Sequence, residues 1–187
     1  MDWNFSFSLS TMTAEDVARQ RAEKDEYFRD SHQSPLGHDQ GHDFKGLIYF
    51  DYNDTFKVAA VFRKKPSLES IKMETSKGHE EEYFHYGQFD FEIDSKKLAL
   101  QAYKPVNHHG EGTLFIPFRD ETSGKESYGA GRYLDLREID GNSYVIDFNL
   151  AYNPFCVYSE DYVCPLPPKD NWLKAEIRAG EKDYKKE

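Results

Sequence analysis

The amino-acid sequence predicts a single-domain, mainly β protein, with an antiparallel β-barrel preferred over a barrel-like sandwich, about eight or nine strands and an N-terminal α-helix. Three observations favour this class. Short strand-like runs follow one another at spacings of roughly 8 to 14 residues. Aromatic residues make up 16% of the 187 residues, a composition typical of strands. Helices do not alternate with these runs, which argues against a parallel doubly wound sheet.

The helix is predicted over residues 14–30, where the sequence reads AEDVARQRAEKDEYFRD. Thr13 and Asp16 have the spacing of a capping box, with Asp in place of the usual Glu. Pro35 closes the region, because proline cannot continue a helix. We therefore expect an N-terminal extension at 1–13, one β-rich domain at 14–182 and a solvated tail at 183–187.

The strand-like period begins after a polar loop at 31–43. Turn signals at Asn53-Asp54, Asp94-Ser95 and Asp140-Gly141-Asn142 separate the runs. The last of these turns predicts the clearest hairpin of the chain, and a change of face near Gly87 predicts a β-bulge. The strands are expected at 46–50, 56–62, 68–74, 82–93, 98–105, 113–118, 132–139, 143–150 and 172–180.

Charge and hydropathy exclude several classes of function. The net charge of −10 argues against nucleic acid and against anionic membrane surfaces, since both need clustered cations. The longest apolar runs fall far short of the roughly 20 residues of a membrane helix. Residues 1–13 lack the basic start and apolar core of a signal peptide, so we expect a cytoplasmic protein.

A first candidate site lies in PFRDETSGKESYGAGRYLDL (117–136). Gly129 and Gly131 leave a stretch of backbone bare of side chains directly before Arg132. A fixed guanidinium beside open amides is a good receptor for a carboxylate or a phosphate. The alternative is a structural Arg132, paired with Asp120, Asp135 or Asp147 to fix the end of a sheet.

A second candidate site lies in DFNLAYNPFCVY (147–158). Asp147 and Asn149 share one face of the predicted strand, and Asn153 begins a turn. Together with Tyr128, Tyr152 and Tyr158 these side chains could line the mouth of a pocket. The alternative is an edge strand whose polar face lies in water.

The cysteines and histidines predict no metal site. Cys156 and Cys164 have neither CxxC spacing nor a histidine close by, and we expect reduced thiols, with a disulfide clamp as the alternative and a metal or nucleophile role as the last choice. His38 and His42 have the i,i+4 spacing of helical metal ligands, but the flanking glycines disfavour a helix. We therefore expect neither a metal nor a cofactor.

Three segments, LFIPFRDETSGKESYGAGRYLDL, DFNLAYNPFCVYSEDYVCPLPP and IRAGEK, resemble an uncharacterised bacterial and archaeal family, domain of unknown function 1684. The resemblance covers roughly residues 14–182. It implies no established activity. The positions that match the family pattern are Asp120, Thr122, Gly124, Tyr128, Gly131, Arg132, Tyr133, Asp135, Asp147, Asn149, Tyr152, Asn153, Cys156, Tyr158, Cys164 and Asn171.

Three functions follow from these candidates. The leading one is a binder of a small ligand with an acidic group, held by Arg132, with Asp120, Asp147, Asn149 and Asn153 as hydrogen-bonding groups and Tyr128, Tyr152 and Tyr158 as walls. The second is an enzyme that uses Asp147 or Asp120 for acid–base chemistry; it predicts a carboxylate with a shifted pKa. The third is an interaction module, whose motif residues bond only to one another.

Overall fold

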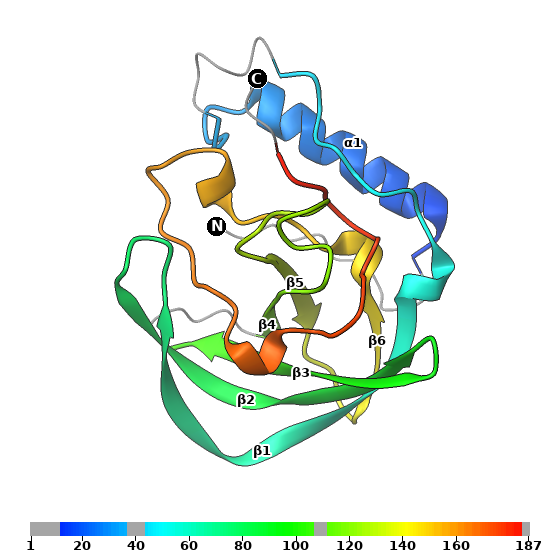
Figure 1. Ribbon diagram of the computed structural model, residues 1–187, viewed down its shortest axis with the longest axis vertical. Coiled ribbons are helices and arrows are strands. Elements are labelled where there is room, and N and C mark those ends of the chain that lie inside the picture. The colour runs from blue at the N-terminus through cyan, green and yellow to red at the C-terminus, as the bar shows by residue number, and fades with distance from the viewer. Residues whose placement is uncertain (1–11, 37–43, 107–111, 185–187) are drawn as a thin grey trace.

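The computed structural model describes residues 12–36, 44–106 and 112–184. Within them, six strands form one antiparallel sheet in the order β5-β4-β3-β2-β1-β6, curled into a nearly closed barrel with the helix α1 (Ala14–Asp30) across one end (Figure 1). The strands are β1 (Lys57–Glu74), β2 (Glu80–Ile93), β3 (Lys96–Pro105), β4 (Thr113–Phe118), β5 (Arg132–Arg137) and β6 (Ser143–Asp147). The predicted class, mainly β with an N-terminal helix, is confirmed.

Nine strands were expected and the sheet has six among the described residues, because two expected strands are one and two others lie outside the sheet. Residues 56–62 and 68–74 belong to the single strand β1, and Pro66 lies where its pairing with β2 shifts register, between Lys64 and Glu69. A proline is tolerated there because it has no amide hydrogen to donate. Residues 46–50 and 172–180 are extended segments outside the sheet, joined to their neighbours by isolated bridges such as Tyr49 with Glu181.

The predicted hairpin around Asp140-Gly141-Asn142 is wrong. β5 pairs with β4 and β6 pairs with β1, so these consecutive strands are the two edges of the sheet. Gly141 does adopt a positive φ of 100°, as the turn signal requires, but the connection crosses the seam of the barrel. The β2–β3 hairpin at Asp94-Ser95 and the bulge at Gly87 are confirmed, the latter by a register shift between His85 and Gly87.

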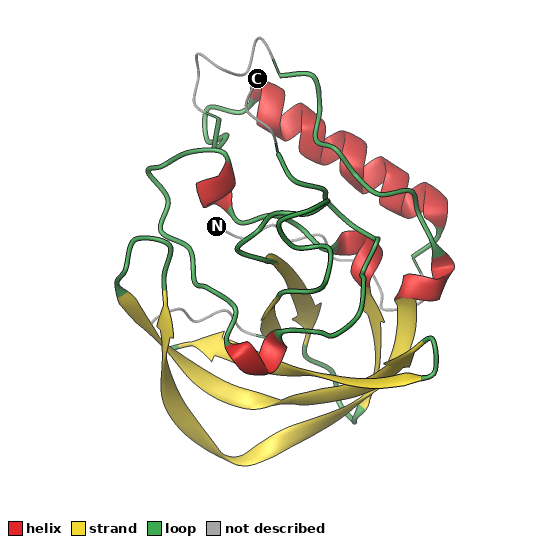
Figure 2. Cartoon of the chain, viewed as in Figure 1, coloured by secondary structure: helices red, strands yellow, loops and turns green. Residues whose placement is uncertain are grey.

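The inside of the barrel is filled. Its apolar core includes Phe89, Leu100, Leu114 and Ile146, all completely buried. The extended segment 172–181, which we call the C-terminal strap, adds Leu173, Ala175, Ile177 and Ala179 to this core. Figure 2 shows the strap among the loops that lie between α1 and the sheet. The barrel therefore encloses a packed core in place of the ligand space that a larger barrel would offer.

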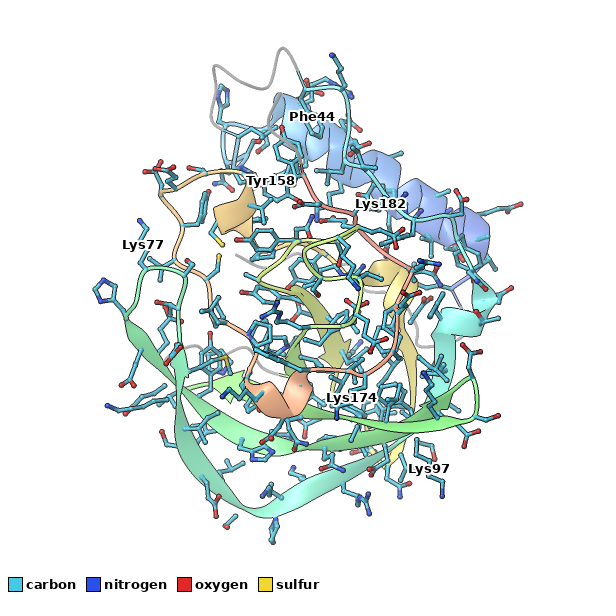
Figure 3. All side chains as sticks on the ribbon, viewed as in Figure 1. Phe44, Lys77, Lys97, Tyr158, Lys174 and Lys182 are labelled. Atoms are coloured by element: carbon cyan, nitrogen blue, oxygen red, sulfur yellow. The ribbon has the colours of Figure 1, made fainter. Side chains whose placement is uncertain are left out.

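The helix begins with the predicted capping box between Thr13 and Asp16. Only a narrow apolar stripe faces the domain, and Val17 and Phe28 are its buried residues. Phe28 packs in a second cluster with Phe44 and Tyr158 (Figure 3). Polar side chains fix the rest of the helix to the domain. Arg21 donates to the carbonyls of Phe50 and Asn149.

Candidate functional site

Arg132, the central residue of the first predicted site, is completely buried. Its Nη2 lies 3.3 Å from Oδ1 of Asp120 and 2.8 Å from the carbonyl oxygen of Ile177. Its Nη1 donates to the carbonyl oxygens of Ala179 and Glu181. The guanidinium thus binds three carbonyls of the C-terminal strap and has no exposed atom for a ligand.

The expected role of Arg132 as an anion receptor is therefore corrected to a structural one, because the chain itself occupies the guanidinium. Of the three ion-pair partners considered from the sequence, Asp120 is the one used. Asp120 is committed as well: its Oδ2 accepts from the amide of Ile177 at 2.8 Å and from the hydroxyl of Thr122 at 2.8 Å. Neither residue is placed to act on a bound molecule.

The polar residues of the second predicted site also bond inward. β6 ends at Asp147, whose Oδ1 accepts from the amide of Asn149 at 2.9 Å and caps the short 3-10 helix η3 (Phe148–Leu150). The side chain of Asn149 bonds both the amide and the carbonyl of Asn53 at 3.0 Å. Asn153 donates from Nδ2 to the carbonyl of Lys182. These side chains join loops within the protein, which is a structural use of groups that were predicted to face a ligand.

Tyr158 is a wall of the apolar cluster beneath α1 (Figure 3), not of a ligand site. Its hydroxyl donates to Oε2 of Glu181 at 2.9 Å. Glu181 is itself buried and also accepts from Lys24 and from the amide of Asn153. Its importance was missed from the sequence, although the IRAGEK segment that contains it belongs to the family resemblance.

Asp135 and Tyr152 behave differently from these inward-bonded groups. Asp135, on the outer side of β5, is exposed, and the hydroxyl of Tyr152 donates to its Oδ2 at 2.6 Å. Burial nevertheless raises the pKa of Asp135, against the opposing effect of that hydrogen bond. Asp135, Tyr152 and the neighbouring Tyr133 therefore form one small group of side chains. We call this place the Asp135 recess.

Aromatic rings form one side of the Asp135 recess. The ring of Tyr152 meets that of Tyr133 edge to face at 5.8 Å between centroids, and Tyr133 continues to Phe115 at 4.9 Å. The ammonium of Lys24 lies 5.3 Å from the centre of the Tyr152 ring, but it pairs with Glu181. Among the described residues, Asp135 has the Tyr152 hydroxyl as its one bonding partner and no cation.

Tyr128, Cys156 and Cys164 meet at another place in the same half of the molecule. Both cysteines are free thiols. The amide of Cys156 donates to Sγ of Cys164 at 3.3 Å, and the hydroxyls of Tyr128 and Ser76 lie close enough to the Cys156 thiol to lower its pKa. Tyr128 of the segment 117–136 and Cys156 of the segment 147–158 therefore lie close together here.

Other candidate sites are less developed. An open hollow of about 470 Å³ lies where the segment before β1 meets the β2–β3 turn and Arg178. In the described ranges, groups of three or more His, Cys, Asp or Glu that could hold a metal are absent. His38 and His42 lie outside the described residues. None of the helices described there is long and apolar enough to cross a membrane.

The comparisons with known proteins agree with the motifs. The family model described as "Protein of unknown function (DUF1684)" matches residues 42–182. A solution NMR structure of an uncharacterized protein from Haloarcula marismortui, gene locus rrnAC0354, is similar to this chain with 38% sequence identity and a TM-score of 0.70. The similarity covers 90% of this chain and 92% of that one. No curated protein is significantly similar. The chain belongs to the DUF1684 family.

Proposed function

We propose that this protein binds a small organic cation, such as a primary or quaternary amine, in the Asp135 recess. The observation that supports this proposal is an exposed carboxylate, that of Asp135, whose pKa is raised and whose bonding partner is the neutral hydroxyl of Tyr152. A desolvated carboxylate is stabilised by a cation that enters its site, because the ion pair replaces the lost hydration. Binding would therefore lower the pKa of Asp135.

The surroundings of Asp135 suit an ammonium group. The rings of Tyr152 and Tyr133 meet beside the carboxylate, and aromatic faces attract cations. The net charge of −10 favours the approach of a positively charged ligand. The expectation of an acidic ligand depended on Arg132, whose hydrogen bonds are taken by Asp120 and the C-terminal strap. The proposed ligand is therefore a cation and no longer an anion.

A matched set of probes tests the proposal. Benzylammonium, benzyl alcohol and benzoate share an aromatic ring and differ in charge. Titration of the ¹⁵N-labelled protein should give shifts of the amides near Asp135 and Tyr152 with benzylammonium, weaker shifts with the alcohol and none with benzoate. Equal responses to all three probes, or shifts confined to other parts of the chain, would contradict the proposal.

Variants separate the recess from general charge effects. Asp135→Asn removes the charge and keeps the size, and should weaken benzylammonium binding at least about tenfold, equivalent to about 1.4 kcal/mol. Tyr152→Phe should have a smaller effect. Asp161→Asn is the matched control, since Asp161 is exposed and bonds to Ser159; it should bind like the unaltered protein. Equal affinities of the Asp135 and Asp161 variants would argue against the recess.

Acid–base catalysis is the second candidate, favoured by the same raised pKa of Asp135. A carboxylic acid whose pKa moves towards neutrality is a better proton donor and acceptor under physiological conditions. Asp135, with Tyr152 beside it, takes the part that the sequence suggested for Asp120 or Asp147. Conversion of an amine ligand, followed by mass spectrometry and lost in Asp135→Asn, would favour an enzyme over a binder.

A further inference from the structure

Four separate segments bring sulfur and hydroxyl groups together at Cys156. Ser76 comes from the β1–β2 turn, Tyr128 from the loop before β5, Cys156 from the short 3-10 helix η4 (Phe155–Val157) and Cys164 from the proline-rich segment that follows. The Cys156 side chain is half-buried and Cys164 is buried. Cys156 is therefore the more accessible of the two residues.

Cys164 is held in place by its backbone. Its amide donates to Oγ of Ser76 at 3.1 Å, and its carbonyl accepts from the amide of Ser76 at 2.8 Å. The amide of Leu166 donates to the carbonyl of Glu74 at 2.7 Å. Sγ of Cys164 lies 3.3 Å from the amide nitrogen of Cys156. The two cysteines therefore lie side by side, and the contact between their thiols is among the causes that shift both pKa values.

The hydrogen bonds differentiate the two thiols. Donation from Cys164, Ser76 and Tyr128 lowers the pKa of Cys156 to about 6, although partial burial opposes this. The same contact with Cys156, together with burial, raises the pKa of Cys164. The pair of thiols therefore loses one proton readily, and the two sulfurs share the proton that remains. Near neutral pH the accessible sulfur is the thiolate, and the thiolate is the reactive form of cysteine.

We propose that Cys156 and Cys164 form a thiol–disulfide exchange site, in which Cys156 attacks a low-molecular-weight disulfide and Cys164 resolves the product. In the first step the Cys156 thiolate bonds one sulfur of RSSR, and the S–S bond breaks to release RS⁻. In the second step Cys164, having lost its proton to RS⁻ or solvent, attacks the Cys156 sulfur and releases a second RS⁻. The protein dithiol is oxidised by two electrons and one RSSR is reduced to two RSH.

A packing role alone accounts for less of this arrangement. Buried cysteines behave as small apolar residues and need no polar partner, whereas Sγ of Cys164 accepts from the amide of Cys156 and the Cys164 amide donates to Ser76. A closed metal site is a poorer fit too, because the described residues bring no third His, Cys, Asp or Glu to the pair and structural zinc uses four ligands. The proposal is independent of the amine site at Asp135.

The test uses glutathione disulfide as the probe and intact mass as the readout. Cys164→Ser should accumulate a stable mixed disulfide with one glutathione at Cys156. Unaltered protein should pass through that species and end with both cysteines linked, two hydrogens lighter. At pH 6, Cys156 should react about tenfold faster than an ordinary thiol, since its greater thiolate fraction outweighs its lower nucleophilicity. The variant Cys156→Ser lacks the attacking thiol and should not show this fast reaction with glutathione disulfide.

Three results would overturn the proposal: equal rates for the two serine variants, a mixed disulfide that persists in the unaltered protein, or oxidation that links one molecule to another. A measurement on the unaltered chain guards against variants that fail to fold. Limiting iodoacetamide at pH 6, followed by peptide mapping, should label Cys156 in preference to Cys164. Equal labelling of both cysteines in the folded protein would also count against the proposal.

Discussion

The Arg132 guanidinium and the Asp120 carboxylate form a completely buried ion pair, with 3.3 Å between Nη2 and Oδ1. Both groups also bind the backbone of the C-terminal strap at Ile177, the arginine through the carbonyl oxygen and the aspartate through the amide. The pair therefore fastens the strap to the start of β5. The two charges are paired with each other inside the protein, which accounts for the burial of the arginine.

Arg132→Met should destabilise the protein strongly. The substitution leaves the Asp120 carboxylate buried without its cation and frees three strap carbonyls, and loss of one partner of a buried pair costs about 3–5 kcal/mol. Urea unfolding measures this loss. Arg178→Met is the control: Arg178 is exposed and pairs with Glu126 and Glu176, so its loss should cost about 1 kcal/mol or less. If Arg132→Met were as stable as the unaltered protein, the structural role assigned to Arg132 would be wrong.

Two glycines with similar backbone angles allow a matched comparison. Gly131 has a φ of 112°, and a Cβ added there would lie 2.6 Å from the carbonyl oxygen of Phe118. Gly141 has a φ of 100° and open space around it. Gly141→Ala should cost about 1–3 kcal/mol from backbone strain alone. Gly131→Ala should cost clearly more, because it adds a clash with backbone. Equal unfolding free energies would show that the Phe118 contact relaxes freely.

Glu181→Gln should loosen α1 from the domain. The Glu181 carboxylate is buried and accepts from Lys24, the amide of Asn153 and the hydroxyl of Tyr158. The amide cannot reproduce these bonds and leaves Lys24 without its counter-charge, at a cost of about 2–4 kcal/mol. Amide hydrogen exchange should rise first in α1. Glu160→Gln, at an exposed position, should leave exchange unchanged; uniform acceleration throughout the chain would contradict a local role.

Asp135→Asn should raise stability at neutral pH. Burial raises the folded pKa of Asp135 above its ordinary value, so the folded state disfavours the ionised form. The resulting penalty is full above the folded pKa and disappears below the unfolded pKa, near 3.9. The variant should therefore be more stable than the parent at pH 7 and equally stable at pH 3. Chemical unfolding at both pH values checks the difference, and a less stable variant at pH 7 would contradict it.

Tyr128→Phe should move the ionisation of Cys156 to higher pH. The Tyr128 hydroxyl is one of the groups that lower the pKa of Cys156 to about 6, because it stabilises the thiolate by hydrogen bonding. The rate of alkylation by iodoacetamide, followed against pH, should have its midpoint near that value and shift upward in the variant. Tyr162→Phe is the control, since Tyr162 contacts the ring of Phe155. Identical pH profiles of alkylation for the two variants would show that the Tyr128 hydroxyl does not lower the pKa of Cys156.

Local signals in the sequence predicted local structure well. The capping box at Thr13 and Asp16, the turn at Asp94-Ser95 and the bulge at Gly87 each depend on residues close in the chain. The Asp140-Gly141 signal gave the turn and not the pairing, because strand partners are chosen by the closure of the whole barrel. A short-range motif carries no information about which edge of the sheet each strand will join.

The candidate site could be predicted only in part for the same reason. The motif segments lie within the part of the chain that matches the family, but polar residues in a motif look alike whether they bind a ligand or one another. Arg132 has a structural role because the C-terminal strap, 45 residues further along the chain, supplies the carbonyl oxygens that accept from its guanidinium. Asp135 and Tyr152 are 17 residues apart, and no spacing rule connects them. Only the folded chain shows which carboxylate lacks a charged partner.

The C-terminal strap has a consequence for synthesis on the ribosome. Its alternate side chains Leu173, Ala175, Ile177 and Ala179 complete the barrel core, and its carbonyls neutralise the field of Arg132. All six strands leave the exit tunnel before those residues do. The nascent sheet therefore waits with an unfinished interior and with an Arg132 that has Asp120 but still lacks the strap carbonyls. We expect cooperative folding to begin only when translation has passed this segment.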